Sequence, residues 1–578
     1  PGCASMPTSG AVREAAAGNA AEQPGIDSEV RVYASPPRPG MDQTQIVNGF
    51  LDAMNSVEPD FAIAKEYLAA PDDWDPSARV RVYDETKREV RTEPSGLRLE
   101  SFLVGEVRPD GRYLPAQPDS LLTQQFDVTK IGGEWRIDHP PSGVLVANID
   151  FTREYVSTDE PIDLYFFDPS YRVLVPDPIY LPKRADLLTA VTEAVLRGPA
   201  DRLADAVVSA VPTGTRLASR PVTAVNGQIT VRLDRTAAGL DDAERKLLTA
   251  QLVWSLSGVS EGAPVVVTVD GVPLYPRPTT TADWELYQPS TPSAEFERFY
   301  LLGESGLMTY DPIPGAKPER VSAGAGGDRL ERLAAFAVSP STRDVAGVSQ
   351  DRTKLFKIRL DPTSERPEPL HSGASALASP SWDRFGGLWV VDQHPAAPRV
   401  YFFDDAGKHE VSVDELGDRK ITALAVSSDG TRVAMITQLP DEEAQLELGF
   451  VKTAPVQPDS PDPRRKVRPV SIVALHELAP QLKPALDVAW VDPQRLVVLI
   501  KDAEGELVQP FEVGVDGRTP DPLPPLDGPV TVAAGGPDVP ILVGTRDGEI
   551  WELSTSTGPA PTRFWIRLTD GISPAYPG

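Results

Sequence analysis

A repeated strand–turn–strand pattern in the C-terminal half of the chain is the feature that most constrains the fold. Five segments share it, and they begin at Phe336, Leu377, Leu424, Asp487 and Val530. Most of the spacings lie near the about 40–45 residues of one propeller blade. Because one such repeat cannot bury its apolar surface alone, its neighbours must complete the core. The pattern therefore predicts a β-propeller over residues 298–578.

The two ends of this region indicate how the ring closes. The strands of "RFYLLGESGLMTYDP" precede the first complete repeat, and the segment "TDGISPAYPG" resembles the repeat starts. If that segment forms the inner strand of the blade begun near residue 298, the ring has six blades and no free edge there. Five or seven blades remain alternatives. The longer third spacing contains a polar, proline-rich insertion, residues 439–469, which is expected in a loop leaving its blade.

Two α+β domains are predicted before the propeller. In residues 41–146, Asp42 is a candidate N-cap for a helix with one apolar face, and a second short helix, "DFAIAKEYLAA", follows. Strand-like runs come next, so two helices on a curved antiparallel sheet are expected. The apolar helix face consists of Ile46, Val47, Phe50, Leu51 and Met54.

The second predicted domain covers residues 147–283. Its helices are "RADLLTAVTEAVLRGP" and "DDAERKLLTAQLVWSLSG", and the second helix has Asp241 and Glu244 in capping-box spacing. The strand "GQITVRLD" lies between them. Residues 1–40 have the composition of a flexible tether, and residues 284–297 are expected to be a linker. The fold class is thus multidomain and mainly β, with two N-terminal α+β domains and a C-terminal β-propeller.

Composition excludes several functional classes. With 84 acidic and 56 basic residues the formal charge is −28, which disfavours nucleic acid or an anionic lipid surface as the main partner. A single cysteine excludes an internal disulfide and cysteine-based metal sites, and the five histidines lack metal-binding spacing. No apolar run of about 18 residues occurs, so no membrane-spanning helix is expected. We expect neither a metal nor a cofactor.

Motifs that resemble catalytic sites have simpler structural interpretations. Gly258–Gly262 fits G-x-S-x-G, but it follows a helix and precedes a strand, the reverse of a nucleophile elbow. We therefore expect a helix end and a turn there, and no enzyme. Two acidic groups lack the spacing of a calcium loop, so solvated loops are favoured over calcium binding or paired carboxylates. These groups are Asp404 with Asp405, and Asp441 with Glu442 and Glu443.

One basic cluster and four tryptophans leave alternatives open. The basic residues Arg464, Arg465, Lys466 and Arg468 form either a solvated loop or a contact for an acidic partner. The tryptophans near strands of different blades either fill the core or form a platform for stacking sugars. They are Trp382, Trp389, Trp490 and Trp551.

The only cysteine, Cys3, lies in "PGCASMPTSG". A free thiol in an exposed tether is liable to oxidation, so a lipid attachment explains this position better than a stray thiol. Gly2-Cys3-Ala4-Ser5 resembles the end of a bacterial lipobox, whose cysteine carries a thioether-linked diacylglycerol and an N-acyl chain. Two or more acyl chains would hold the protein stably on a membrane. We therefore predict Cys3 as the lipidated residue.

Taken together, "IVNGFLDAM", "AKEYLAAPDDWDP", "TAQLVWSL" and "VVVTVDGVPL", followed by a propeller, resemble the actinobacterial LpqB lipoprotein family. The middle stretch is similar to the GerM-type sporulation and germination domain. The resemblance implies a non-enzymatic envelope lipoprotein on the outer face of the cytoplasmic membrane. It also implies binding to the extracellular region of the sensor kinase MtrB and modulation of MtrA–MtrB signalling. The alternatives are a propeller that binds or hydrolyses cell-wall glycan, or a structural scaffold among envelope proteins.

Overall fold

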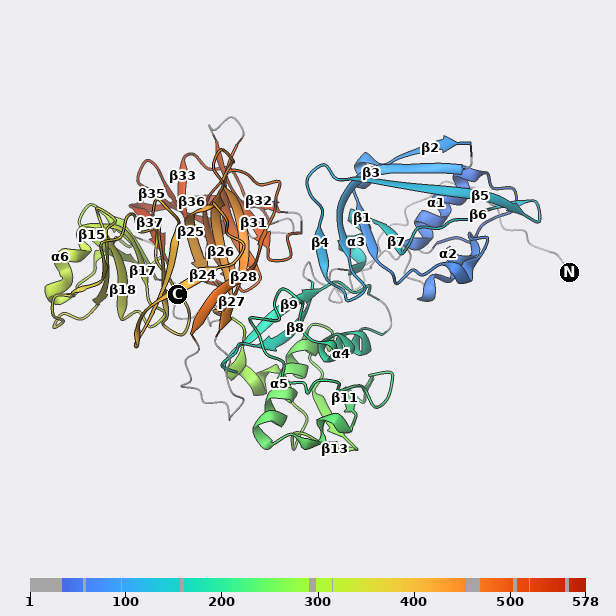
Figure 1. The fold of residues 1–578 in the computed structure, drawn as a ribbon, viewed down its shortest axis with the longest axis horizontal. Coiled ribbons are helices and arrows are strands. Elements are labelled where there is room, and N and C mark those ends of the chain that lie inside the picture. The colour runs from blue at the N-terminus through green and yellow to red at the C-terminus, as the bar shows by residue number, and fades with distance from the viewer. Residues whose placement is uncertain are drawn as a thin grey trace, which may run out of the picture.

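The molecule has three folded parts in chain order, and Figure 1 shows the propeller on one side, the first domain on the other and the second domain below them. The fold is multidomain and mainly β, with two N-terminal α+β domains and a C-terminal β-propeller, which confirms the predicted class. Cys3 and the basic residues Arg464, Arg465 and Lys466 lie outside the described residues. This computed structural model describes residues 34–55, 59–94, 96–155, 161–183, 186–290, 298–313, 315–453, 468–502, 507–518, 520–556 and 561–578.

Helix α1 (Gln43–Met54) begins where its cap predicts. The Asp42 carboxylate accepts a hydrogen bond from the Gln45 N–H, and the Gln45 side chain accepts one from the Asp42 N–H, which completes a capping box. All five residues of the predicted apolar face are buried. Helix α1 packs on the sheet of the first domain, and the short α2 (Ala62–Glu66) packs against α1.

That sheet is mixed, so the expected antiparallel sheet was wrong in one respect. Its strands run in the order β6-β5-β3-β1-β7, and β7 is parallel to β1. The reason is topological: the chain leaves β6 at one edge and enters β7 at the opposite edge, a crossover rather than a hairpin. The strands are β1 (Val80–Tyr83), β2 (Glu89–Glu93), β3 (Gly96–Val107), β4 (Tyr113–Pro115), β5 (Leu121–Ile131), β6 (Glu134–Ile137) and β7 (Val144–Ala147).

Helix α3 (Asn148–Tyr155) belongs to the first core by its packing. Phe151 and Tyr155 are buried, and the Phe151 ring stacks on Tyr113, with 5.8 Å between the ring centroids. The first core therefore continues to Tyr155, beyond residue 146.

The second domain contains two small sheets and two long helices. Strands β8 (Ile162–Phe167) and β9 (Leu174–Ile179) pair antiparallel. Helix α5 (Asp242–Ser257) starts at the predicted capping box of Asp241 and Glu244 and packs against α4 (Leu187–Arg197) and β8. It also connects two parallel strands of the other sheet. That sheet comprises β10 (Ala224–Val225), β11 (Gln228–Leu233), β12 (Val265–Val269) and β13 (Val272–Pro273).

The segment that follows β13 contains a helical turn that packs on the second domain, where an extended linker was expected from residue 284. Residues Thr281–Tyr287 form a 3-10 helix in which Trp284 is buried against Tyr275 and Tyr287. The part of the expected linker up to Tyr287 is therefore part of the second domain by its packing.

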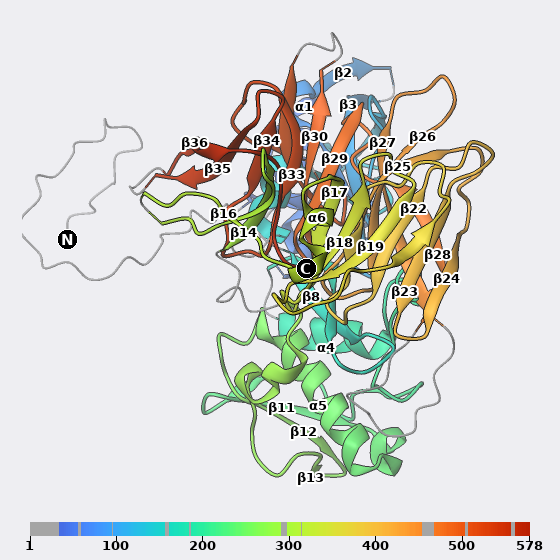
Figure 2. The same cartoon turned by 90° about the vertical axis from the view of Figure 1, so that its left-hand side faces the viewer.

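The C-terminal region forms six four-stranded blades, the number predicted, seen from another side in Figure 2. Blade 1 holds β37 (Ile572–Ala575), β14 (Phe299–Gly303), β15 (Gly306–Tyr310) and β16 (Glu319–Arg320). Blade 2 holds β17 (Leu333–Val338), β18 (Asp344–Ser349), β19 (Lys354–Arg359) and β20 (Pro369–Ser372). Blade 3 holds β21 (Ser381–Trp382), β22 (Leu388–Asp392), β23 (Arg399–Asp404) and β24 (Gly407–Val413).

The remaining blades follow the same order from the inner to the outer strand. Blade 4 holds β25 (Lys420–Val426), β26 (Arg432–Gln438), β27 (Gln445–Thr453) and β28 (Pro469–Glu477). Blade 5 holds β29 (Ala485–Asp492), β30 (Arg495–Lys501), β31 (Val508–Gly514) and β32 (Asp521–Pro522). Blade 6 holds β33 (Pro529–Ala533), β34 (Leu542–Thr545), β35 (Glu549–Thr555) and β36 (Arg563–Asp570).

Ring closure follows the prediction, but the insertion does not. Strand β37 pairs with β14, so the last strand of the chain completes the first blade. The expected loop over residues 439–469 was wrong in part, because it contains β27, the third strand of blade 4. Leu446, Leu448 and Phe450 of β27 are buried in the blade, and their alternation was concealed by the acidic and proline-rich residues around them.

The second domain and the propeller share one apolar core. Leu164 and Val175 of the β8–β9 hairpin belong to the same buried cluster as Leu446 and Leu496 of blades 4 and 5. Figure 1 shows β8 and β9 at the centre of the molecule, where the three parts meet.

Polar contacts around β9 join all three parts. Arg112 of the first domain pairs with Asp177 of β9 at 2.6 Å, and both side chains are largely buried. On the propeller side, Arg432 donates to the Pro176 carbonyl, and the hydroxyl of Tyr180 donates to Asp516. Strand β9 is thus held from both sides.

Candidate functional site

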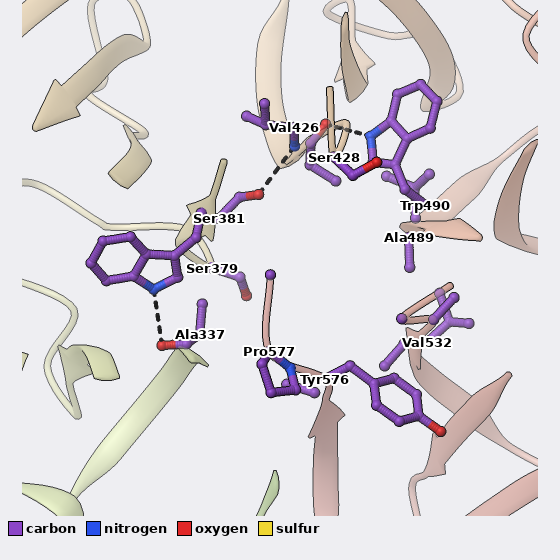
Figure 3. A pocket seen from close by; sticks show the side chains of 18 of the residues that line it. Ala337, Ser379, Ser381, Val426, Ser428, Ala489, Trp490, Val532, Tyr576 and Pro577 are labelled. Carbon is purple, nitrogen blue, oxygen red and sulfur yellow. Dashed lines mark hydrogen bonds between the residues drawn. The ribbon is translucent and has the colours of Figure 1, made fainter. Parts of the chain in front are cut away.

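The central channel of the propeller is a cavity lined by all six blades. It has a volume of about 330 Å³ and runs between the inner strands of the six blades. Small side chains such as Ala337, Ser379 and Ala489 surround it, together with Trp490 and Pro577 (Figure 3). Small residues at these positions let six inner strands approach one axis.

Each of the six seams between blades has a polar contact near this channel. Trp382 Nε1 donates to the Ala337 carbonyl, and Trp490 Nε1 donates to the Ala425 carbonyl. Ser381 Oγ accepts from the Val426 N–H, as Figure 3 shows. Between blades 5 and 6, the Val532 N–H donates to Asp487 Oδ2. Between blades 6 and 1, the Tyr576 hydroxyl donates to the Pro540 carbonyl. Between blades 1 and 2, the Gly578 N–H donates to the Val338 carbonyl. Several polar groups around the channel therefore hold the ring together.

The four tryptophans pack or form hydrogen bonds within the propeller. Trp382 and Trp389 are buried, which confirms core filling for these two. Trp389 packs edge-on against Phe402, with 5.2 Å between the ring centroids. Trp490 and Trp551 are only partly buried, and their Nε1 groups donate to the Ala425 carbonyl and to Glu549. All four indoles are thus part of the blade architecture.

Asp487 is a carboxylate that lines the channel and binds its proton more tightly than an exposed aspartate does. Burial raises the pKa of Asp487 to about 6, although the backbone N–H groups of Val532 and Val488 favour the charged form. No charged side chain contributes to this shift. Between about pH 4 and pH 6, Asp487 therefore binds a proton more readily in the folded than in the unfolded protein.

We predict a pH-dependent difference in stability between the wild-type protein and Asp487→Asn. A raised carboxyl pKa gives stability that is complete below about pH 4 and is lost as the pH rises through about 6. The amide keeps an acceptor for Val532 N–H and carries no charge. From pH 4.5 to pH 7.5, the stability of the variant relative to wild type should increase by about 2 kcal/mol. Denaturant midpoints across that range measure it, and a constant difference would contradict the assignment.

Asp404 was expected in a solvated loop, and that expectation was wrong. Its carboxylate is largely buried and accepts hydrogen bonds from the Ala406 N–H, His409 and Arg468. Burial alone would raise the pKa of Asp404, but these donors hold it below its usual range. Arg468 of the predicted basic cluster therefore binds an internal carboxylate, while Asp405 is exposed.

The other sequence candidates have the structures predicted for them. Gly258 caps the C-terminus of α5, and Ser260 Oγ donates to the Ser257 carbonyl within the following turn. Asp441, Glu442 and Glu443 form an exposed turn between β26 and β27. Over the ranges that the structure describes, no three His, Cys, Asp or Glu side chains gather into a metal-binding group. Among those residues, no helix is both long and apolar enough to span a membrane.

The buried pair Asp429–Arg432 was not predicted from the sequence. The two side chains meet at 2.7 Å, and both are almost completely inaccessible. A signal was present, since Arg432 directly precedes the apolar run "VAMIT" of a central strand. A charged residue at such a position is rarely buried unless paired.

Comparisons with known families match all three parts. Residues 36–152 match the model "Lipoprotein LpqB, N-terminal domain", residues 163–275 match "Sporulation and spore germination", and residues 317–577 match "Lipoprotein LpqB beta-propeller domain". Among solved structures, TolB from Acinetobacter baumannii has 13% identity and a TM-score of 0.33, covering 51% of this chain and 70% of that one.

Whole-chain relatives agree with these matches. The chain is 29% identical to a Lipoprotein LpqB of Thermobifida fusca and 30% identical to one of Streptomyces avermitilis. Each alignment covers 100% of this chain and 96% of the relative. The six-bladed propeller, the two preceding α+β domains and this similarity over the full length lead to one conclusion: the chain belongs to the LpqB lipoprotein family.

Proposed function

We propose that this protein is a membrane-anchored extracytoplasmic lipoprotein that binds the extracellular region of the sensor kinase MtrB and modulates MtrA–MtrB signalling. The observation that carries the proposal is the joining of the three parts into one body. A shared apolar core connects the second domain to the propeller, and the buried Arg112–Asp177 pair connects the first domain to the second. Such a body presents surfaces from different domains in a fixed relation.

A fixed set of surfaces suits a regulator that acts by binding. A partner with two conformations shifts toward the one that is bound more tightly. The polar contacts at the blade seams favour binding over catalysis, because they engage Asp487, Trp382 and Trp490 in holding the propeller together. Loop surfaces of the three parts are then the surfaces that meet the kinase.

The proposed anchor gives a direct prediction about membrane attachment. Replacing Cys3 with serine in the full precursor removes the thiol that would carry the diacylglycerol, so the protein should move from the membrane fraction to the soluble fraction without unfolding. Fractionation and thermal unfolding measure the two effects. Ser5→Ala is the matched control and should stay membrane-bound, whereas a Cys3→Ser protein that stayed in salt-washed membranes would contradict the anchor.

Co-purification tests the partner. Lipidated protein solubilised from membranes in mild detergent should carry the kinase with it, and the Cys3→Ser form mixed with the purified extracellular region of the kinase should do the same. Loss of both interactions contradicts kinase binding, while loss of only the second identifies the anchor as necessary for the interaction.

Cell-wall glycan is the competing partner. Trp382 is buried in its blade cluster, so its ring offers little exposed face on which a sugar could stack. Trp490 is only partly buried. Co-sedimentation with purified peptidoglycan decides this point. Retention that a Trp490→Ala variant abolishes would favour the glycan alternative.

A further inference from the structure

The outer strand of blade 6, β36, differs from the outer strands of the other blades. Strands β16 and β32 have two residues each and β20 has four, while β24 and β28 pair with one another. Strand β36 has eight residues and is the last strand of its sheet. Figure 2 shows β35 and β36 at the outer edge of the propeller. Long, open edges are uncommon because they pair with other chains.

This strand also exposes large apolar side chains. Phe564 is 42% exposed and Ile566 is 39% exposed. They lie on the same face as Leu568, which packs against the core next to blade 1. Because the outer strand β16 of blade 1 has only two residues, it leaves Phe564 and Ile566 uncovered. Trp565, on the other face, packs against the core next to blade 5.

The backbone of this edge is available for pairing. Strand β36 pairs antiparallel with β35, and the Ser556 N–H donates to the Thr562 carbonyl at the start of the hairpin. Because these bonds alternate along an antiparallel pair, the backbone groups of Arg563, Trp565 and Arg567 point away from β35. The described part of the chain adds no further strand to this edge.

We propose that β36 is a self-association edge, on which a second copy of this chain adds its own β36 in antiparallel register about a two-fold axis at Ile566. In this register Ile566 faces Ile566 of the other copy, and Phe564 lies opposite the β-bulge at Leu568. The two apolar strips therefore cover one another, as an isologous contact requires. Outer strands of this propeller also pair edge to edge within the chain, although in parallel: β24 and β28 connect blades 3 and 4 into one eight-stranded sheet.

The charges near β36 are consistent with a second copy as the occupant. Arg563 is paired with Glu512 and Asp521, and Arg567 is paired with Glu549 and Asp570. With two arginines against four carboxylates, the edge is net acidic, like the chain as a whole with its net charge of −28. Two such chains repel at long range, so salt should strengthen their association by screening. A basic partner on the same edge would instead bind more weakly as salt increases.

Sedimentation equilibrium of the full chain carrying Cys3→Ser tests self-association. Between about 1 and 100 µM, the average mass should rise toward twice the monomer mass, and more strongly in 500 mM than in 50 mM NaCl. Ile566→Asp places two like charges together on the axis and should keep the protein monomeric. Val272→Asp, at an exposed residue on β13 of the second domain, is the matched control and should behave like its parent.

Cross-linking tests the register. In the Cys3→Ser background no other cysteine remains, so Ile566→Cys places one thiol opposite its copy and should yield a disulfide-linked dimer under mild oxidation. Phe564→Cys is the control, because its two copies would lie about 13 Å apart along the strands and should not cross-link. Equal cross-linking of the two variants, a monomer at every concentration, or association that weakens with salt would each overturn the proposal. This test does not depend on kinase binding.

Discussion

Replacing Arg432 with alanine should lower the free energy of unfolding of the propeller by about 3–5 kcal/mol. The Arg432 side chain is 2% exposed and its guanidinium donates to three acceptors. They are Asp429 Oδ2 at 2.7 Å, the Pro493 carbonyl at 3.4 Å and the Pro176 carbonyl of the second domain. Without the guanidinium, Asp429 Oδ2 is left as a buried charge without its ion-pair partner. The same substitution removes a contact between two domains.

Two variants separate this mechanism from a general loss of packing. Arg432→Ala combined with Asp429→Ala should be less destabilised than Arg432→Ala alone, because no buried charge remains. Arg235→Ala, which breaks the exposed Arg235–Asp270 pair, should change stability by less than about 1 kcal/mol. Chemical denaturation followed by tryptophan fluorescence measures all three. An Arg432→Ala protein as stable as Arg235→Ala would contradict the buried-pair account.

Replacing Arg112 with alanine should loosen the first domain from the second and lower stability by about 3 kcal/mol at neutral pH. Arg112 is the ion-pair partner of Asp177, whose carboxylate also accepts the Ala200 N–H at 2.9 Å. Burial raises the pKa of Asp177, and Arg112 opposes that rise. Loss of Arg112 raises this pKa further, so the effect should be greatest near pH 7.5 and smaller near pH 5, where the carboxyl group can bind a proton.

Hydrogen exchange can locate this effect. Arg112→Ala should increase exchange in β4 and at Tyr180, whose N–H donates to the Gly111 carbonyl across the same interface, and leave blade 2 of the propeller unchanged. Adding Asp177→Asn should recover part of the stability and remove the pH dependence. An Arg112→Ala protein whose stability loss is the same at pH 5 and pH 7.5 would contradict the role of Asp177.

Local signals in the sequence were sufficient for much of the fold. The capping boxes at Asp42 and Asp241 predicted where α1 and α5 begin, because a cap depends on residues only three positions apart. The repeat pattern predicted six blades and their closure by β37, since each blade repeats the same local order of strands and turns.

Contacts between residues far apart in the sequence could not be predicted from such local signals. Asp404 of blade 3 meets Arg468, 64 residues later, because β28 of blade 4 pairs with β24 of blade 3. Arg112, Asp177 and Arg432 converge on β9 only after three domains have docked. The parallel pairing of β7 with β1 likewise depends on the path of the chain across a sheet. Residue type and spacing carry little information about such docking.

The most direct test of the central claim, that this protein is a binding platform for the sensor kinase, is a calorimetric titration of the purified extracellular region of the kinase into the Cys3→Ser chain. We predict saturable binding with a dissociation constant below about 10 µM, equivalent to about −7 kcal/mol, unchanged by Asp487→Asn. Absence of binding at about 50 µM kinase, with both proteins folded, would contradict the claim.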